Sequence, residues 1–316
     1  MKKLLLIIFA LALVGSCLIG STAINPFNAS PVEKDILLSL RLPRVLFSAV
    51  IGAMLGLSGS VYQLTLKNPL ADSFTTGAAS SSALGAVLAI AFGLPVALVP
   101  ITALATGLIG LMTVYRLSKT NGVINPVTMI LAGVVMNIVA SAVISFAKYF
   151  FEDSLSSIVF WLMGGFFVVD WSKLLLCTAV LVIAYLLFTT KALQLNLLAL
   201  DEHSAQSLGV NVDRLRTLSF VVATALVAVA VSHTGIIGFV GLIVPHVARS
   251  LFGSDMQKNM FFSALLGALL LVLADAGART IIPGGAELPV GIITALLGGV
   301  FFLYLLQTRR ERFWHG

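Results

Sequence analysis

The sequence predicts an all-α polytopic membrane protein of about ten transmembrane helices, and three observations lead to this fold class. Hydrophobic residues make up 59% of the 316 positions and charged residues only 10%, with a mean hydropathy of +1.07. This composition is typical of chains whose solvent is the bilayer. Apolar runs of spanning length follow one another along nearly the whole chain, and most basic residues lie in the short gaps between them. Little sequence is left for a soluble catalytic domain.

Ten apolar runs approach the roughly 20 residues that a spanning helix needs. They cover residues 4–23, 45–64, 74–94, 96–115, 126–147, 171–190, 217–232, 236–252, 260–278 and 288–306. No hydrophilic linker interrupts the series, so we expect one integral-membrane domain over residues 1–316. Two related halves of five spans would be oppositely oriented, as in the inverted repeats of many transporters. Only the number of spans favours such a repeat here.

The first run has a second interpretation. Lys2 and Lys3 followed by apolar residues are typical of a secretory signal, and residues 14–17 (Val-Gly-Ser-Cys) loosely resemble a lipoprotein cleavage site. The apolar stretch, however, continues to Ala23, and the rest of the chain is also suited to the membrane. We therefore favour an uncleaved first span.

The distribution of basic residues predicts the orientation, because Lys and Arg near span ends normally stay in the cytoplasm. With the N-terminus inside, the predicted cytoplasmic stretches hold thirteen of the nineteen: Lys2, Lys3, Lys67, Arg116, Lys119, Lys191, Arg214, Arg216, Arg249, Lys258, Arg309, Arg310 and Arg312. The other six are Lys34, Arg41, Arg44, Lys148, Lys173 and Arg279. We expect a multi-pass protein of the bacterial cytoplasmic (inner) membrane with both termini in the cytoplasm.

Arg41, Arg44 and Arg279 are notable among the outward exceptions. Arg41 and Arg44 are three residues apart and can share one face of a helix, and an arginine fork binds carboxylates in a bidentate manner. Binding an acidic partner outside the membrane would explain them. Two alternatives stay open: Arg41 and Arg44 anchor to lipid headgroups, or Asp275, one turn before Arg279, simply neutralises Arg279.

Several function classes find little support. The sequence has no GxxxxGK[ST] phosphate-binding loop, no HExxH and no His/Cys cluster, so we predict no ATP-binding site, no metal site, no catalytic residues and no cofactor in this chain. Cys17 and Cys177 lie in apolar runs without CxxC spacing. Orientation explains the net charge of +6 better than nucleic-acid binding does. The Gly52/Gly56 pair and the small residues 77–83 predict close helix packing rather than a serine nucleophile.

The longest polar break covers residues 198–213 in a predicted cytoplasmic stretch. Asp201 and Glu202, then helix-forming residues, then Gly209 predict a short helix with acidic residues at its N-terminus and glycine at its end. Such a helix on the membrane surface would suit docking of a soluble partner. A plain connecting loop is the alternative.

The fifth run carries a polar stripe. Gly133, Asn137, Ser141 and Ser145 recur every four residues, and Lys148 continues the series. This spacing places them on one slowly rotating helix face. Polar residues in a span usually face protein or water, so we favour a translocation path over the alternative of helix–helix association.

Seven ordered segments together resemble the FecCD-type permease family of ABC importers, which carries iron chelates, haem and cobalamin. They are residues 41–44 (RLPR), 58–59 (SG) with Gln63, 68–71 (NPLA), 161–165 (WLMGG), 205–209 (AQSLG), 238–246 (GFVGLIVPH) and 287–291 (ELPVG). The resemblance covers essentially the whole chain. It implies a type II ABC importer permease fold, with a second permease copy, two cytoplasmic ATPase subunits and an extracytoplasmic substrate-binding protein as partners.

The resemblance also implies roles for particular residues. Docking of the binding protein falls to Arg41, Arg44 and Arg279. Coupling to the ATPase falls to a cytoplasmic loop at about 197–215, with Asp201, Glu202, Ala205 and Gly209. The inner gate includes Asn68, Pro69, Leu70 and Ala71, and the helix with Asn137, Ser141 and Ser145 borders the path.

The expected function is therefore ATP-driven import of a metal chelate, most simply a ferric siderophore, with cobalamin and haem as alternatives. An ion-driven secondary transporter is the rival from another class. Such proteins usually carry acidic groups near the middle of the membrane, and here only Asp275 comes near. An intramembrane enzyme is disfavoured because no catalytic cluster is evident.

Overall fold

The computed structural model describes residues 2–20, 30–120, 123–167, 169–282 and 286–308, and each predicted apolar run contains one principal helix. These helices are α1 (Lys2–Leu18), α3 (Leu42–Thr65), α4 (Ala78–Ala91), α5 (Val99–Ser118), α6 (Pro126–Phe150), α8 (Trp171–Thr190), α11 (Val212–Thr234), α12 (Val240–Phe252), α13 (Met256–Ala278) and α14 (Val290–Thr308). The predicted all-α class is confirmed. Residues 21–23 of the first run lie outside the described residues.

Short elements connect the principal helices. They are α2 (Pro31–Asp35), the π-helical turn η1 (Ile36–Arg41), the 3₁₀ turns η2 (Val96–Leu98) and η3 (Glu152–Ser154), α7 (Leu155–Leu162), α9 (Ala192–Leu200), α10 (Glu202–Ser207), β1 (Lys119–Thr120) and β2 (Val123–Ile124). The two strands form an antiparallel pair in which Lys119 lies opposite Ile124.

The helical stretch before α3 is longer than the apolar run predicts. Helix α2, the η1 turn and α3 form one candidate span over Pro31–Thr65, so Arg41 and Arg44 lie in a helix rather than in a loop. Ser30 starts this stretch with a capping box, in which its hydroxyl accepts from the Glu33 amide and the Glu33 carboxylate accepts from the Ser30 amide. A hydropathy pattern cannot find this start because the capping residues are polar.

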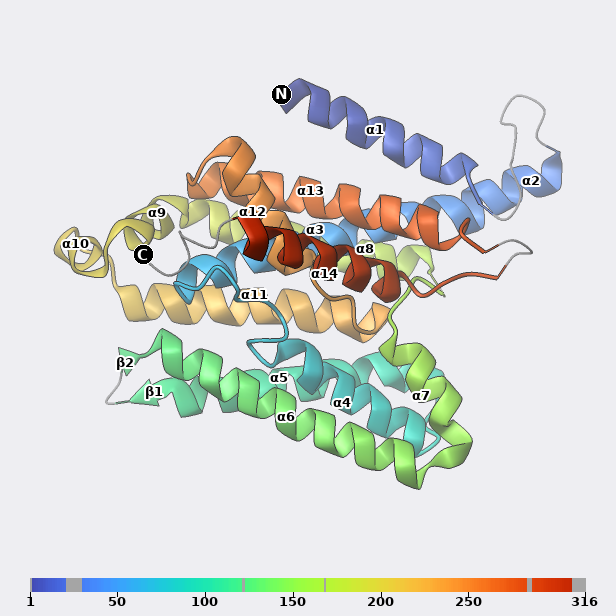
Figure 1. Cartoon of the computed structure of the whole chain (residues 1–316), viewed down its shortest axis with the longest axis horizontal. Helices are drawn as coiled ribbons and strands as arrows, with labels where there is room; N and C mark the ends of the chain where they lie inside the picture. The colour runs from blue at the N-terminus through green and yellow to red at the C-terminus, as the bar shows by residue number, and fades with distance from the viewer. Residues whose placement is uncertain (1, 21–29, 121–122, 168, 283–285, 309–316) are drawn as a thin grey trace.

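The helices lie in a flattened bundle (Figure 1). Helix α11 runs through its middle, with α4, α5 and α6 on one side and α3, α13 and α1 on the other. Among the described residues, six helical stretches are long and apolar enough to cross a membrane, while α4, α12 and α14 are shorter apolar helices. We name the two ends of the bundle by residues. The Glu202 end holds α9, α10 and the β1–β2 pair, and the Arg44 end holds α2, α7 and the start of α3.

Glycines on α3 let its backbone touch two neighbouring helices. A Cβ atom at Gly52 would lie 2.1 Å from the carbonyl oxygen of Gly267 on α13, and one at Gly59 would lie 1.9 Å from that of Gly241 on α12. In lipid no hydrophobic force drives helices together, so their association depends on van der Waals packing at such close contacts. These glycines thus place the backbone of α3 directly against α12 and α13.

Candidate functional site

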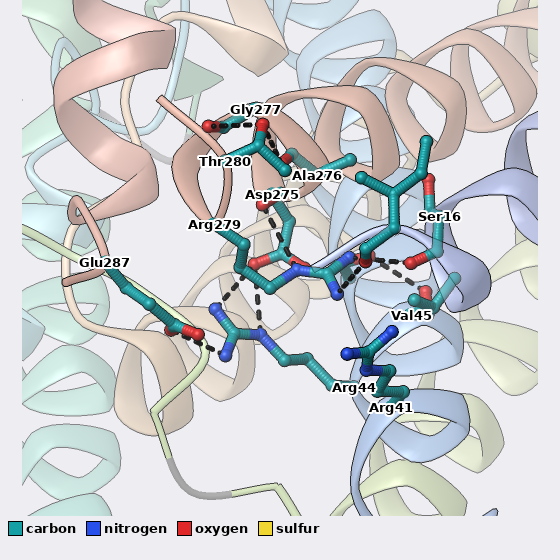
Figure 2. Close-up of polar contacts among 12 residues, drawn as sticks. Ser16, Arg41, Arg44, Val45, Asp275, Ala276, Gly277, Arg279, Thr280 and Glu287 are labelled. Atoms are coloured by element: carbon teal, nitrogen blue, oxygen red, sulfur yellow. Dashed lines mark hydrogen bonds and ion pairs between the residues drawn. The ribbon is translucent and has the colours of Figure 1, made fainter. Parts of the chain in front are cut away.

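At the Arg44 end, the Arg44 side chain joins three distant parts of the chain (Figure 2). Its Nε and Nη2 atoms lie 3.1 and 2.9 Å from Asp275 Oδ1 on α13, and its Nη1 donates to Glu287 Oε2 at 2.7 Å. These charge-assisted bonds are stronger than neutral ones. The arginine fork therefore fixes α3 against α13 and the segment that precedes α14.

Arg41 and Arg279 point into the bundle beneath the end of α1. Arg41 Nη1 donates to the carbonyl of Leu18 at 3.0 Å, and Arg279 donates to Ile19 and Ser16 at 3.0 Å each. The last carbonyls of a helix have no intrahelical partner and carry its partial negative charge. Both side chains are almost fully buried, so these arginines cap α1 in this structure.

Asp275 is the centre of this cluster. Its side chain is 1% exposed, with Arg44 on one carboxylate oxygen and Arg279 Nε 3.0 Å from the other. A buried charge is tolerated only when it is well paired. The spacing of Asp275 and Arg279 suggested that they form an ion pair, and this pair is present in the structure. Arg44 and Arg279 pair with the two carboxylates, while Arg41 bonds carbonyls, so the cluster carries one excess positive charge.

At the Glu202 end, the predicted short helix is present as α10. The Asp201 side chain caps it by accepting from the Ser204 amide at 2.8 Å, Ala205 is fully buried, and Gly209 follows at a φ of 84°, a conformation that favours glycine. His203 and Gln206 are exposed. Helix α10 thus presents polar side chains outward from a fixed position.

Arg216 holds α10 in that position, and the sequence analysis missed it. This side chain, 1% exposed, bonds Glu202 through Nη2 (3.1 Å) and Nη1 (3.4 Å), the Ile124 carbonyl through Nη1 (3.0 Å) and the Thr65 carbonyl through Nε (3.2 Å). Burial raises the pKa of Glu202, but Arg216 and Lys67 outweigh this and hold it below its ordinary value. Arg216 therefore joins α10, β2 and the last turn of α3.

The predicted inner-gate residues follow α3 directly. The Asn68 side chain accepts from the Leu70 amide at 2.9 Å, and the Ala71 amide donates to the Asn68 carbonyl at 3.1 Å, which closes a tight turn around Pro69. Ala71 is fully buried, whereas Leu70 is 45% exposed. Lys67, just before this turn, lies 3.4 Å from Glu202. The structure thus brings the predicted gate and the predicted coupling segment together.

The predicted stripe on α6 is exposed over part of its length. Gly133 is buried against the backbone of Thr75, Asn137 is half-buried, and Ser141 and Ser145 are exposed. The helix thus packs on its own chain near its start and leaves its serines uncovered toward the Arg44 end.

The model of the FecCD transport family matches residues 4–308. This chain belongs to that family. Proteins of similar sequence include a cobalamin import system permease protein of Halobacterium salinarum, which is 39% identical over 90% of this chain and 77% of the relative. A hemin transport system permease protein of Yersinia pestis is 35% identical over 99% of this chain and 96% of the relative. A solved ABC transporter of the metal-chelate type, in an inward-facing conformation, has a TM-score of 0.89 at 35% identity, over 97% of this chain and 99% of that one.

Two of the FecCD segments found in the sequence meet in space, and one of them also contacts the residues just before a third segment. The Gly165 amide donates to the Thr234 carbonyl at 2.8 Å, just before segment 238–246, and the Gly291 amide donates to the Gly164 carbonyl at 3.2 Å. A Cβ at Gly291 would lie 2.1 Å from the Met163 carbonyl oxygen. These glycines therefore allow segments 161–165 and 287–291 to pack backbone to backbone, with segment 161–165 also against Thr234.

Proposed function

We propose that this chain is the permease subunit of a binding-protein-dependent ABC importer that moves a metal chelate into the cytoplasm. The observation that carries the proposal is the whole-chain similarity to a solved metal-chelate ABC transporter, at a TM-score of 0.89. ATP hydrolysis then falls to separate cytoplasmic subunits. The Glu202 end faces the cytoplasm, with both termini on that side.

Coupling to the ATPase uses α10. A partner can shift a conformational equilibrium only through different affinities for the two states. A nucleotide-dependent shift of α10 acts on Glu202, and the Glu202–Arg216 pair passes it to the carbonyl of Thr65. Thr65 ends α3, directly before the turn of Asn68 to Ala71. The two sets of residues proposed for coupling and gating are thereby one mechanical unit.

Docking of the binding protein uses the Arg44 cluster. Of the three arginines, Arg44 has the most accessible partner, because the side chain of Glu287 is 33% exposed. An acidic group on the binding protein can replace Glu287 on Arg44 Nη1 without uncovering Asp275. Arg41 and Arg279 reach such a partner only when the end of α1 moves, since they bond its carbonyls.

The translocation path forms between two copies of the chain. Support comes from Ser141 and Ser145, which are exposed on α6 although serines in a span normally face protein or water. A second copy, or the water of a path between the copies, supplies that environment. Asn137 continues the same face toward the Glu202 end.

The substrate class follows from the relatives rather than from one residue. Their names cover cobalamin and hemin, and the solved transporter is of the metal-chelate type. We assign a ferric siderophore first, with cobalamin and haem as alternatives within the same machinery. The metal travels as cargo in its chelate.

A secondary transporter would need a carboxylate free to exchange protons or ions. Asp275 does not meet this need, because Arg44 and Arg279 both pair with it. Reconstitution with the ATPase subunits and the binding protein in vesicles tests the choice. Chelate uptake should require ATP and the binding protein, whereas uptake driven by a proton gradient alone would overturn the proposal.

A further inference from the structure

A groove of ≈ 940 Å³ lies at the Glu202 end of the bundle and borders Ile124, one of the Arg216 partners. Its walls come from the end of α5 and the β1–β2 pair, from the α8–α9 junction, from the loop between α10 and α11 and from the start of α11. The residues that line it include Tyr115, Lys119, Lys191, Arg214, Leu218 and Val221. Figure 1 shows β1, α9 and the start of α11 at the same end of the molecule.

One end of the groove is positively charged. Lys119, Lys191 and Arg214 line it, and none of the three pairs with a carboxylate in the part of the chain that the structure describes. The lining carboxylate of Asp213 instead accepts from the Ile124 amide at 3.2 Å. Lys119 Nζ lies 5.9 Å from the centre of the Tyr115 ring. Three basic side chains around one groove with a single carboxylate favour an anionic ligand.

The other end of the groove is apolar and lies along the span. Leu218 and Val221 are 36% and 38% exposed, and both line the groove on α11. Val221 is seven residues beyond Arg214, about 10 Å along a helix. A ligand that fills the groove therefore needs an anionic group at one end and an apolar chain at the other. A soluble protein cannot follow α11 this far into the membrane.

We propose that this groove binds an anionic phospholipid. The phosphate of the headgroup lies among Lys119, Lys191 and Arg214, and an acyl chain covers Leu218 and Val221. Basic pockets between spanning helices on the cytoplasmic side have the chemistry that recognises such headgroups. The proposal rests on the proposed orientation, in which the Glu202 end faces the cytoplasm.

The test compares two triple variants with equal charge change. The full chain is purified and mixed with phosphatidylglycerol or phosphatidylcholine, and retained lipid is counted by native mass spectrometry. The groove variant is K119Q/K191Q/R214Q. The control is K3Q/K258Q/R116Q, which changes exposed residues outside the groove on the same predicted side.

The amount of phosphatidylglycerol retained by the groove variant should fall at least tenfold, since each cation near an anionic surface raises the binding constant roughly fivefold. The control should stay within about twofold of the parent. A charge-retaining variant, K119R/K191R/R214K, should keep the lipid, which tests the proposal even if the glutamine variant folds poorly. Equal loss in groove and control variants, or loss in the charge-retaining variant, would overturn the proposal.

Two further arms identify the source of the anion. Excess inorganic phosphate should leave phosphatidylglycerol bound, and its complete displacement would make the groove a phosphate site. Addition of the ATPase subunits should also leave the lipid in place, and its release would assign the groove to that interface. The readout needs no transport, so a failure here is distinct from a failure of the importer function.

Discussion

Arg216 on α11 and Glu202 on α10 form an ion pair, with Nη2 and Oε2 3.1 Å apart, while Arg216 Nε also donates to the last turn of α3. One buried guanidinium thus connects the surface helix α10 to the last residue of α3, Thr65. Replacement by lysine keeps the charge but loses the planar fork.

Arg216→Lys should uncouple ATP hydrolysis from transport. We expect chelate uptake per ATP hydrolysed to fall at least about tenfold, because the compact ammonium of lysine lacks the planar fork that spans Glu202 and the Thr65 carbonyl. Uptake and phosphate release are measured in the same vesicles. Arg116→Lys, at an exposed position of α5, is the matched control. Normal stoichiometry in Arg216→Lys would show that α10 signals by another route.

Glu287→Gln should strengthen docking of the binding protein, because it removes the carboxylate that competes for Arg44. Arg44→Glu should weaken docking, and a reversal from acidic to basic on the binding protein should partly restore it. The affinity is measured in nanodiscs at several salt concentrations, since exposed charges are screened over roughly 10 Å at 0.1 M. Unchanged affinity in both variants would assign Arg44 to internal packing only.

The anchoring of α10 should be insensitive to pH down to the acid range. The pKa of Glu202 is held below its ordinary value of 4.5, mainly by Arg216 against the opposing effect of burial. Its stabilising contribution is therefore present above pH 4.5 and is lost as the pH falls through the lowered pKa. A fluorophore on Ser207→Cys should keep constant anisotropy between pH 8 and about 5.

Glu202→Gln should raise the mobility of that fluorophore already at pH 7. His203 lies exposed beside Glu202 on the same short helix, so His203→Gln serves as the control background. A loss of anisotropy between pH 7 and 5 that persists in this background would contradict the role of the Glu202–Arg216 pair.

Gly52→Ala should destabilise the bundle although alanine favours helices. Its Cβ would lie 2.1 Å from the backbone of Gly267, and overpacking costs about 1–3 kcal/mol or more. Thermal unfolding in detergent measures the loss. Gly15→Ala on α1, where nothing lies within 4 Å of the added carbon, should be neutral or stabilising. Similar melting of the two variants would mean that α3 and α13 separate easily.

Cysteines at Ser141 and Ser145 should react with water-soluble thiol reagents in at least one nucleotide state. The background replaces Cys17 and Cys177, both buried, with serine. A cysteine at Ala140, fully buried on the same helix, should stay protected. Protection of all three positions in every state would assign the α6 serines to helix packing.

The sequence predicted the spans well because bilayer thickness imposes a length on each apolar run. It also predicted α10, whose cap and terminal glycine are local signals, and it offered the pairing of Asp275 with Arg279, one helical turn apart, as an alternative to docking. It missed the extension of the α3 span through α2 and η1, because the polar residues that start this stretch interrupt the apolar run from which spans are predicted. Local patterns could not reveal the bond between Arg44 and Asp275, which lie 231 residues apart.

The role of Arg216 could not be predicted from local sequence either. Its position beside a predicted span is fully compatible with the orientation rule, so nothing in the sequence distinguished it from Arg214. The structure separates them: Arg216 is buried and bonded on three sides, whereas Arg214 is exposed. A charge near a span end acquires a specific role only through residues that the fold brings to it.

The bond between Arg279 and Ser16 has a consequence for the order in which the protein is made. These residues are 263 positions apart, so α1 leaves the ribosome long before the second of the two guanidinium groups that cap its last carbonyls exists. At 5–20 residues per second this interval lasts roughly 13 to 53 s. During that time Arg41 is the one capping arginine of the two that has already been made, and the final seating of α1 waits for synthesis of α13.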